Sequence, residues 1–260
     1  MQMIKQRESL YQKFVEQICK DCNCKQEEVR TAENVFTQLK SIDGMRRFRD
    51  DDTILKIICL NGKIICSAAD RILPRCEELF GKESGAWFSR FDNLSKLEKL
   101  ISSEGYCIDY AHHFYLPFGT PSVTEADLQQ FRNTFDVKWY EGAELEQFRG
   151  DERFHFALSF LERVPDMLAV TAEKDGEILG MSGVSRDSDE LWQIGIDVSP
   201  EARGKKLGAC LTILVKKEVL RRGKLPFYGT VESHIQSQSV AVKSGFVPAW
   251  YELQTGRKKA

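Results

Sequence analysis

A run of glycine and basic residues follows a strand-like segment in the last third of the chain. The segment reads Ile194-Gly-Ile-Asp-Val-Ser-Pro-Glu-Ala-Arg-Gly-Lys-Lys-Leu-Gly208, and an amphipathic stretch from Ala209 to Leu220 comes next. A turn between a strand and a helix directs free backbone N–H groups and the positive end of the helix dipole at one point. Arg203, Lys205 and Lys206 add positive charge there. The pattern predicts a site for a phosphorylated ligand, and the alternative is a surface helix with a positively charged start.

The spacing of this loop also resembles a family pattern. Residues 202–209 resemble the R-x-x-G-x-G/A pyrophosphate loop of the GNAT N-acetyltransferase superfamily, and the residues before them look like the end of that family's fourth strand. Lys206 stands where the first motif glycine is usual; it keeps its N–H, whereas glycine permits closer backbone approach. The resemblance assigns these residues to the cofactor: Ile196, Asp197, Val198, Arg203, Gly204, Lys205, Lys206, Leu207, Gly208 and Ala209.

A second segment, His234–Phe246, resembles the N-x-x-S-x-x-V-A-x-K-x-G-F helix that lies beside the pantetheine arm in the same family. His234 replaces the common Asn, and Ala241 stands where many members carry a Tyr that protonates the departing thiolate. Ser233 and Gln236 predict a capping box at the start of this helix. The resemblance covers roughly residues 137–253 and extends to uncharacterised two-domain bacterial acetyltransferase-like proteins.

The resemblance implies transfer of an acetyl group from acetyl-CoA, as co-substrate, to an amine that attacks the thioester directly. At neutral pH only ~1 in 2,500 lysine-like amines is unprotonated, so a base is useful. Glu190 aligns with a position that supplies a catalytic carboxylate in some members, although it also fits a solvated loop. His234 is the other catalytic candidate, either as a proton carrier or as a hydrogen-bonding partner of the pantetheine. Backbone N–H groups around Ile196–Val198 are expected to polarise the thioester carbonyl.

The order of predicted elements from residue 137 onward matches the acetyltransferase core. Strands are expected at Val137–Glu141, Met167–Glu173, Glu177–Val184, Glu190–Val198, Phe227–Val231 and Phe246–Leu253, and helices at Glu144–Phe160, Arg203–Arg222 and from His234. The fold class is therefore α/β (α+β), with a mixed, mostly antiparallel twisted sheet and helices on both faces. Gly195, inside its strand, is typical of a bulge or of a closely approaching ligand.

The chain divides at the turn-rich stretch Phe118–Glu125. We expect an N-terminal α+β domain over residues 1–120 and the GNAT domain over residues 121–260. Asn61-Gly62 predicts a two-residue hairpin in the first domain, and the apolar spacing of residues 29–39 predicts a helix. A degenerate acetyltransferase-like half is one interpretation of this domain, although it shows no phosphate loop.

The composition is that of an ordinary globular protein. The chain has 260 residues, of which 42% are apolar, and a formal charge of −2. This balance argues against a nucleic-acid-binding face, and no apolar run reaches membrane-spanning length. The N-terminus lacks the apolar core of a signal peptide, and the eight cysteines are interpreted as reduced thiols. The expected location is the cytoplasm, with no membrane partner.

Three of the cysteines, Cys19, Cys22 and Cys24, have C-x-x-C-x-C spacing. This spacing is compatible with zinc or an iron–sulfur centre, but no second Cys/His pair stands nearby to complete a tetrahedral site. More distant cysteines are candidate fourth ligands after folding. We expect ordinary thiols at a helix end and no metal.

Two function classes therefore stay open. The first is an N-acetyltransferase whose N-terminal domain helps to shape the acceptor site. The second is a non-catalytic acyl-CoA-binding or interaction protein built on a GNAT core. The acceptor, an amine on a small molecule or peptide, is left open among polyamines, amino acids, aminoglycosides and protein N-termini, because variable loops build that side of the fold. The oligomeric state is also open, with a homodimer as one option.

Overall fold

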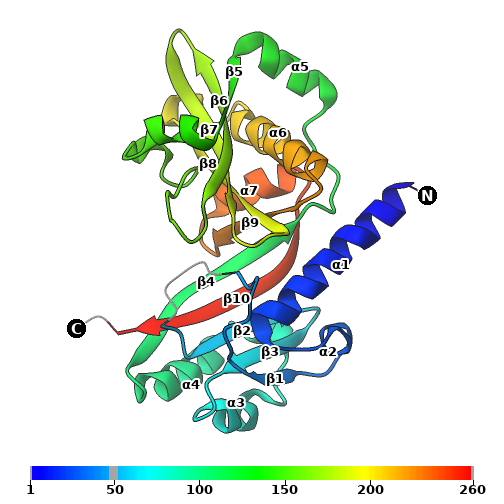
Figure 1. Ribbon diagram of the computed structural model, residues 1–260, viewed down its shortest axis with the longest axis vertical. Helices are drawn as coiled ribbons and strands as arrows, with labels where there is room; N and C mark the ends of the chain where they lie inside the picture. Colours follow the sequence, from blue (N-terminus) through cyan, green and yellow to red (C-terminus); the bar gives the residue numbers. More distant parts are fainter. Residues whose placement is uncertain (1, 47–51, 259–260) are drawn as a thin grey trace. The chain divides into compact units, whose positions relative to one another are not determined.

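The computed structural model describes residues 2–46 and 52–258 (Figure 1). Residue contacts divide the chain into two compact units, Met1–Phe114 with Ala249–Ala260, and Tyr115–Pro248. The domains expected from the sequence were residues 1–120 and 121–260. The last strand differs from that expectation, because from Ala249 onward it belongs to the first unit.

The first unit is an α+β fold around five neighbouring strands in the order β1-β3-β2-β10-β4. Its elements are α1 (Gln2–Cys22), α2 (Gln26–Arg30), β1 (Val35–Gln38), β2 (Leu55–Leu60), β3 (Lys63–Ala68), α3 (Leu73–Phe80), η1 (Gly85–Trp87), α4 (Phe91–Ser102), β4 (Tyr106–Leu116) and β10 (Val247–Arg257). The hairpin at Asn61-Gly62 is confirmed, and both residues have the positive φ that a tight hairpin turn requires. The helix predicted over residues 29–39 is wrong.

Parallel pairing with β3 explains that error. Val35 lies opposite Ile65, and β1 covers most of the C-terminal half of the expected helix. Val, Phe and Thr in succession favour a strand once a neighbouring strand edge is available. Of the residues in the expected helix, only the first two lie in a helix, the five-residue α2.

A buried charge network lies in the core of the first unit. The Arg46 guanidinium forms ion pairs with Asp21 and, at 2.7 Å, with Glu252. Tyr110 Oη donates to Glu252 at 2.8 Å, and Trp250 Nε1 donates to the same carboxylate at 3.0 Å. Burial alone raises the pKa of Glu252, but the charges of neighbouring cations outweigh this and hold the pKa at about 2. The network therefore stays charged inside the core.

Replacing Arg46 tests how much the fold depends on this network. Arg46→Met leaves Asp21 and Glu252 as buried carboxylates without their main cation, so we expect a loss of about 3–5 kcal/mol in the free energy of unfolding. Urea denaturation at pH 7 measures this loss. Arg75→Met is the matched control, because Arg75 and Glu78 form an exposed pair that contributes less than about 1 kcal/mol. Equal losses in the two variants would contradict a structural role for the network.

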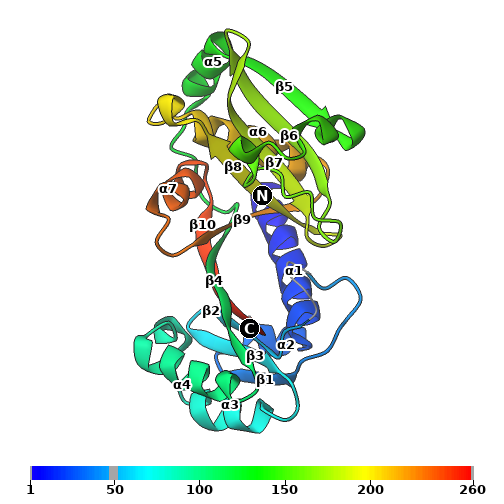
Figure 2. The same ribbon diagram turned by 90° about the vertical axis from the view of Figure 1, so that its left-hand side faces the viewer.

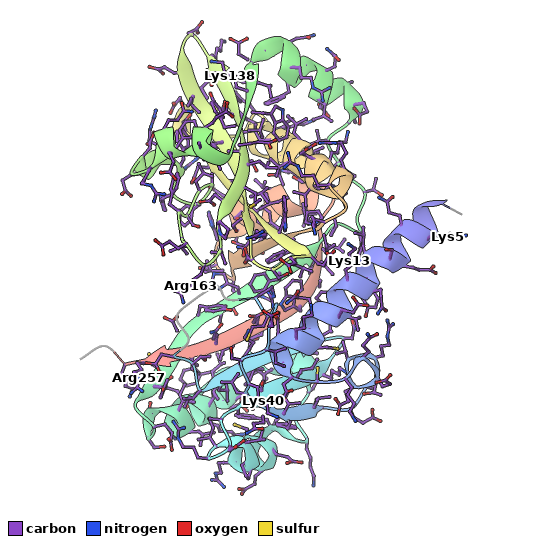
Figure 3. The ribbon with its side chains drawn as sticks, in the orientation of Figure 1. Lys5, Lys13, Lys40, Lys138, Arg163 and Arg257 are labelled. Atoms are coloured by element: carbon purple, nitrogen blue, oxygen red, sulfur yellow. The ribbon has the colours of Figure 1, made fainter. Side chains whose placement is uncertain are left out.

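The second unit contains the expected acetyltransferase-like strand order. Its elements are α5 (Glu125–Thr134), β5 (Asp136–Glu141), η2 (Gly142–Phe148), η3 (Glu152–Phe154), β6 (Asp166–Lys174), β7 (Glu177–Arg186), β8 (Leu191–Val198), η4 (Pro200–Ala202), α6 (Leu207–Arg221), β9 (Leu225–Val231) and α7 (Ile235–Lys243). Strands β5 to β8 pair antiparallel in sequence order, and β8 pairs parallel with β9. The mixed, mostly antiparallel sheet is confirmed, and Figure 2 shows α6 running along these strands. At the outer strand β5, Lys138 (labelled in Figure 3) pairs with Glu173 of β6 at 2.5 Å.

The two faces of this sheet are covered differently. Helix α6 packs on one face through an apolar core that includes Ile194, Leu211 and Val215. The other face is covered by η2, η3 and the loop after them, with Phe154 and Met181 in its core. A helical segment over Glu144–Phe160, with Gly150 as a candidate break, was expected here, but the structure has two short 3-10 helices. Gly150 lies between them with a φ of +83°, a conformation that interrupts a right-handed helix.

The three clustered cysteines lie at and just after the end of α1. Cys22 is fully buried at the end of α1, and Cys24 donates its thiol to the Ile18 carbonyl. Among the described residues, no group of three or more His, Cys, Asp or Glu side chains is placed to hold a metal ion. Within the same part of the chain, no helix is both long and apolar enough to cross a membrane.

Candidate active site

The central feature of the site is a gap between two adjacent strands. Strands β8 and β9 pair from Leu191 opposite Leu225 to Ile194 opposite Tyr228. Pairing stops there, although β8 continues to Val198 and β9 to Val231. Backbone N–H and C=O groups on the β9 side of residues 195–198 are therefore available to a ligand that enters between the strands.

The glycine- and lysine-rich loop lies directly after β8 and forms the start of α6. The first helical hydrogen bond of α6 runs from Cys210 N to Lys206 O at 2.9 Å. Within the described chain, the backbone N–H groups of residues 204–209 donate to no protein acceptor. Arg203, Gly204, Lys205 and Lys206 are all exposed. The loop predicted to bind phosphate therefore has a row of backbone N–H groups without protein acceptors at the N-terminus of α6.

Lys206, which stands where the resemblance expects a glycine, has a left-handed backbone. Its φ is +60° and its ψ is 5°. A non-glycine residue in this conformation costs roughly 1–2 kcal/mol. The Lys206 ammonium forms an ion pair with Asp127 at 2.8 Å, and this bond, with Thr124, holds the pKa of Asp127 at about 2. The Lys206 side chain is therefore engaged by Asp127, while its backbone N–H belongs to the row of free donors.

Helix α7 begins at the end of β9, beside the gap. His234 is exposed and occupies the N-cap position, without a side-chain capping bond. The capping box predicted from Ser233 and Gln236 is therefore wrong, because the chain after β9 turns at residues 232–233 and the helix starts one residue later. Exposed Val231 and Ile235 place apolar surface at this end of the gap.

The position of the missing tyrosine is fully buried. Ala241 has no exposed surface and packs in the core beneath α6. A different hydroxyl pair lies close to the gap: Tyr228 Oη and Ser237 Oγ are 2.8 Å apart. Burial raises the pKa of Tyr228 to about 12. Sequence reasoning missed this pair because Tyr228 belongs to a strand and not to the motif helix.

Two cross-strand glycines let a loop lie flat on the sheet. Gly195 of β8 lies opposite Gly183 of β7, and the pairing runs through them without a shift in register. The expected bulge at Gly195 is therefore wrong. A Cβ at Gly195 would come within 1.9 Å of the Phe156 carbonyl oxygen, and one at Gly183 within 2.0 Å of the Ala157 carbonyl oxygen. Glycine is needed here because the loop after η3 approaches the strands closely.

The same loop is held by two carboxylates from the sheet. Asp197 Oδ2 accepts hydrogen bonds from Phe156 N and Ala157 N, both at 2.9 Å. Asp166 accepts from Phe160 N at 2.7 Å and from Ser159 N at 3.4 Å. Burial raises the pKa of both carboxyl groups above the ordinary value, although the amide hydrogen bonds oppose this. Asp197 was expected to contribute only its backbone.

Glu190 does not lie near the loop. It precedes β8 and forms an ion pair with Lys224 at 3.2 Å. Because each strand residue advances about 3.3 Å, Glu190 lies roughly 20 Å along the strand from Ile196. The structure thus brings His234, residues 196–198 and the loop 203–209 to one end of β8, and it places Glu190 at the other end.

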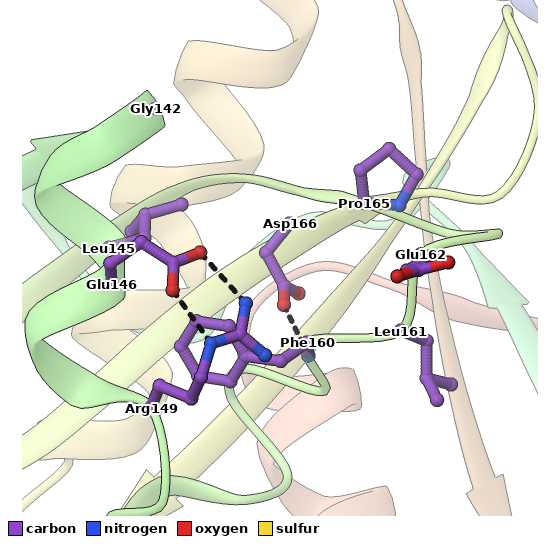
Figure 4. A pocket seen from close by; sticks show the side chains of 9 residues that line it. All are labelled: Gly142, Leu145, Glu146, Arg149, Phe160, Leu161, Glu162, Pro165 and Asp166. Atoms are coloured by element: carbon purple, nitrogen blue, oxygen red, sulfur yellow. Dashed lines mark hydrogen bonds and ion pairs between the residues drawn. The ribbon is translucent and has the colours of Figure 1, made fainter.

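A small pocket of about 140 Å³ lies on the face opposite α6, between η2 and the start of β6 (Figure 4). Three of its charged side chains, Glu146, Arg149 and Asp166, already have partners. Arg149 forms two hydrogen bonds with Glu146 and lies 4.4 Å from the centre of the Phe160 ring. Asp166 is occupied by the two backbone amides described above. We assign no chemistry to this pocket.

Comparison with known proteins shows what the second unit resembles. Residues 127–246 match the model of the acetyltransferase (GNAT) family. This match supports a GNAT-superfamily assignment of these residues. At the family level this fold transfers an acyl group from acyl-CoA to an amine. The two sequence motifs both lie within the matched residues, and no curated protein matches the chain.

Several solved structures are similar to the chain at low identity. A GNAT-family acetyltransferase from Colwellia psychrerythraea is 13% identical, with 81% of this chain and 84% of that chain covered and a TM-score of 0.44. A GCN5-related N-acetyltransferase-like protein from Streptococcus suis is 17% identical, with coverage of 64% and 68% and a TM-score of 0.44. A GCN5-related N-acetyltransferase from Kribbella flavida is 14% identical, with coverage of 63% and 64% and a TM-score of 0.42.

Substitution of Gly195 tests the close approach that shapes this GNAT domain. Gly195→Ala forces the Phe156 carbonyl away from β8, so we expect a loss of about 1–3 kcal/mol in the free energy of unfolding, measured by urea denaturation. Gly256→Ala on β10 is the control, because its Cβ would meet only the Asp109 side chain, at 3.1 Å. A Gly195→Ala variant as stable as the Gly256→Ala variant would contradict the close contact.

Proposed function

We propose that the protein is an acetyl-CoA-dependent N-acetyltransferase. The observation that carries this proposal is the row of free backbone N–H groups at residues 204–209, placed where β8 separates from β9. The row suits a diphosphate, and the gap suits an extended arm that hydrogen-bonds along a strand edge. A ligand with both parts in sequence is coenzyme A.

With coenzyme A bound in this way, the thioester of acetyl-CoA would lie at the end of β8. Backbone N–H groups of Ile196–Val198 that face the gap are placed to polarise its carbonyl, because they are fixed before the oxyanion forms. Val231 and Ile235 supply apolar contacts for the arm. The amine attacks the carbonyl carbon, the C–S bond breaks, and the thiolate leaves.

Two side chains were expected to move protons. We propose that His234, exposed at the start of α7, protonates the thiolate or orients the pantetheine. Glu190 is the carboxylate that the family resemblance suggests as base, but its position before β8 gives it the weaker support. The acceptor is proposed to be an amine on a small molecule or peptide rather than a nucleic acid or membrane lipid. The described thiols, all free, agree with a reducing cytoplasm.

One observation favours a second candidate function. Ala241 is buried and cannot act as an acid, so the chain lacks the proton donor that many family members use. A non-catalytic acyl-CoA-binding protein would keep the loop and the gap and would need neither His234 nor Glu190.

Two variants at Lys206 test the binding site. Lys206→Gly keeps the N–H and the positive φ, so we expect the Kd for coenzyme A to stay within about threefold. Lys206→Pro removes the N–H and fixes φ near −65°, so we expect the Kd to rise at least about tenfold. Calorimetry measures both values, and S-acetylpantetheine, which lacks the diphosphate, should not distinguish the variants. Equal coenzyme A affinity in the two variants would contradict the diphosphate site.

Turnover separates the two candidate functions. Thiol release from acetyl-CoA is measured with polyamines, amino acids, aminoglycosides and peptides. For an amine that reacts, we expect His234→Gln to lower kcat about 100-fold while acetyl-CoA binding persists, because the proton donor is lost. Gln236→Ala, exposed on the same helix, is the control and should retain activity. Binding without thiol release from any amine would favour the non-catalytic function, and failure to bind any acyl-CoA would contradict both.

A further inference from the structure

We propose that Asp197 is the base that takes the proton from the acceptor amine. This inference rests on the proposed acetyltransferase function and assigns the base within it. The argument depends on where the Asp197 carboxylate lies, how it is held, and which of its oxygens is unoccupied.

Asp197 lies at the gap, on the face of the sheet that is turned away from α6. Along β8, Ile196 and Val198 face Gly208 at the start of α6. Asp197 alternates with them and therefore shares the opposite face with Gly195, where the loop after η3 lies. A thioester held from the α6 side presents its carbonyl carbon at residues 196–198. An amine that approaches from the other face meets Asp197 there.

Hydrogen bonds orient the Asp197 carboxylate through one of its two oxygens only. Oδ2 accepts both backbone amides, from Phe156 and Ala157, and these two bonds fix the side chain. Oδ1 accepts no hydrogen bond from any residue that the structure describes. A base needs this arrangement, because one oxygen holds the geometry and the other receives the proton.

The surroundings also suit a proton acceptor. Burial raises the pKa of Asp197, while the amides of Phe156 and Ala157, the imidazole of His155 and the guanidinium of Arg203 lower it. The charge of Asp197 also acts on Tyr228 of β9, whose ring lies in the core on the α6 side of the sheet. A carboxylate with a raised pKa is a better base than an exposed one, because its proton affinity lies closer to working pH. Phe156 is 65% exposed and His155 is also exposed, so the loop that Asp197 holds presents side chains to solvent.

The proton transfers balance. Asp197 Oδ1 takes one proton from the ammonium group, directly or through water, and the freed nitrogen lone pair forms the N–C bond with the thioester carbonyl carbon. The tetrahedral intermediate collapses as the C–S bond breaks, and a second nitrogen-bound proton ends on the thiolate. The amide and free coenzyme A are the products, and the proton on Asp197 passes to solvent. No oxidant, reductant or metal is required.

The structure supplies a matched control. Asp166 holds the same loop by the same type of bond, with a pKa also raised by burial, but it lies on β6, two strands away from β8. Asp197→Asn keeps one oxygen that can accept both of its backbone amides. Asp166 accepts from Phe160 N through Oδ2 and from Ser159 N through Oδ1, so Asp166→Asn loses one of its two bonds to the loop. Both variants lose the carboxylate charge, and Asp166→Asn perturbs the loop at least as much while lying farther from the reacting carbon.

The test measures kcat, KM and pH dependence with acetyl-CoA and a reactive amine. We expect Asp197→Asn to lower kcat at least about 100-fold, with the KM for acetyl-CoA and the urea midpoint changed little. Asp166→Asn should retain kcat within about threefold. In the wild type, kcat should fall as pH decreases through the raised pKa of Asp197, because the protonated carboxyl group cannot accept the amine proton. The residual kcat of Asp197→Asn should not show this fall at low pH.

Three outcomes would overturn the assignment: Asp197→Asn activity within threefold of wild type, equal losses in both Asn variants, or a large loss in Glu190→Gln alone. Equal losses would mean that the carboxylates act only by holding the loop. Failure of the proposed function gives a different result, since the wild type would then release no thiol from acetyl-CoA with any amine.

Discussion

The chemistry of the second unit depends on the loss of hydrogen bonding between β8 and β9 beyond Ile194 and Tyr228. Buried backbone groups rarely stay without partners, so a strand edge that opens in the middle of a sheet must be completed by something else. Water can do this, but an extended ligand arm does it with the same geometry as a missing strand. The loop at residues 204–209, the start of α7 and the Asp197 carboxylate all lie around this opening, and none of them forms a site without it.

Several locally unfavourable features of the second unit lie around this opening between β8 and β9. Lys206 has a left-handed backbone at the point where the loop with the free amides enters α6. Gly183 and Gly195 carry no side chains, because the loop after η3 must lie against β7 and β8 to bring Phe156 beside Asp197. Asp197 is half-buried and charged, because two amides and nearby cations offset part of its desolvation. Each cost is local, and each is compensated by a contact that positions part of the site.

The cofactor side of the site could be predicted from the sequence, because its chemistry is local. A strand, a glycine-containing turn and a helix follow one another within residues 191–221, so the residue spacing alone determines where the free amides point. The acceptor side could not be predicted in this way. The significance of Asp197 depends on Phe156, forty-one residues earlier, and the segment between residues 142 and 160 has an apolar pattern that fits an α-helix as well as the observed 3-10 turns. The sequence predicted a strand over Phe246–Leu253 but not that it belongs to the first unit, because its partner β2 lies about 190 residues earlier in the chain.

The buried position of Ala241 limits how the leaving thiolate can gain its proton. Tyr228 is the described tyrosine on β9 at the gap, and it lies on the α6 side of the sheet, where the thiolate forms. Its pKa of about 12 lies well above that of an ordinary thiol, about 8.5, so proton transfer from Tyr228 to the thiolate is uphill by about 5 kcal/mol. The hydrogen bond between Tyr228 and Ser237 is therefore better suited to holding α7 against β9 than to supplying a proton. Under the proposed function, a group in contact with solvent, exposed His234 or water, is therefore better suited than Tyr228 to protonate the thiolate. In that proposal the acid lies at the start of α7 and the base, Asp197, lies on the opposite face of β8, so the proton moves from amine to thiolate across the strand.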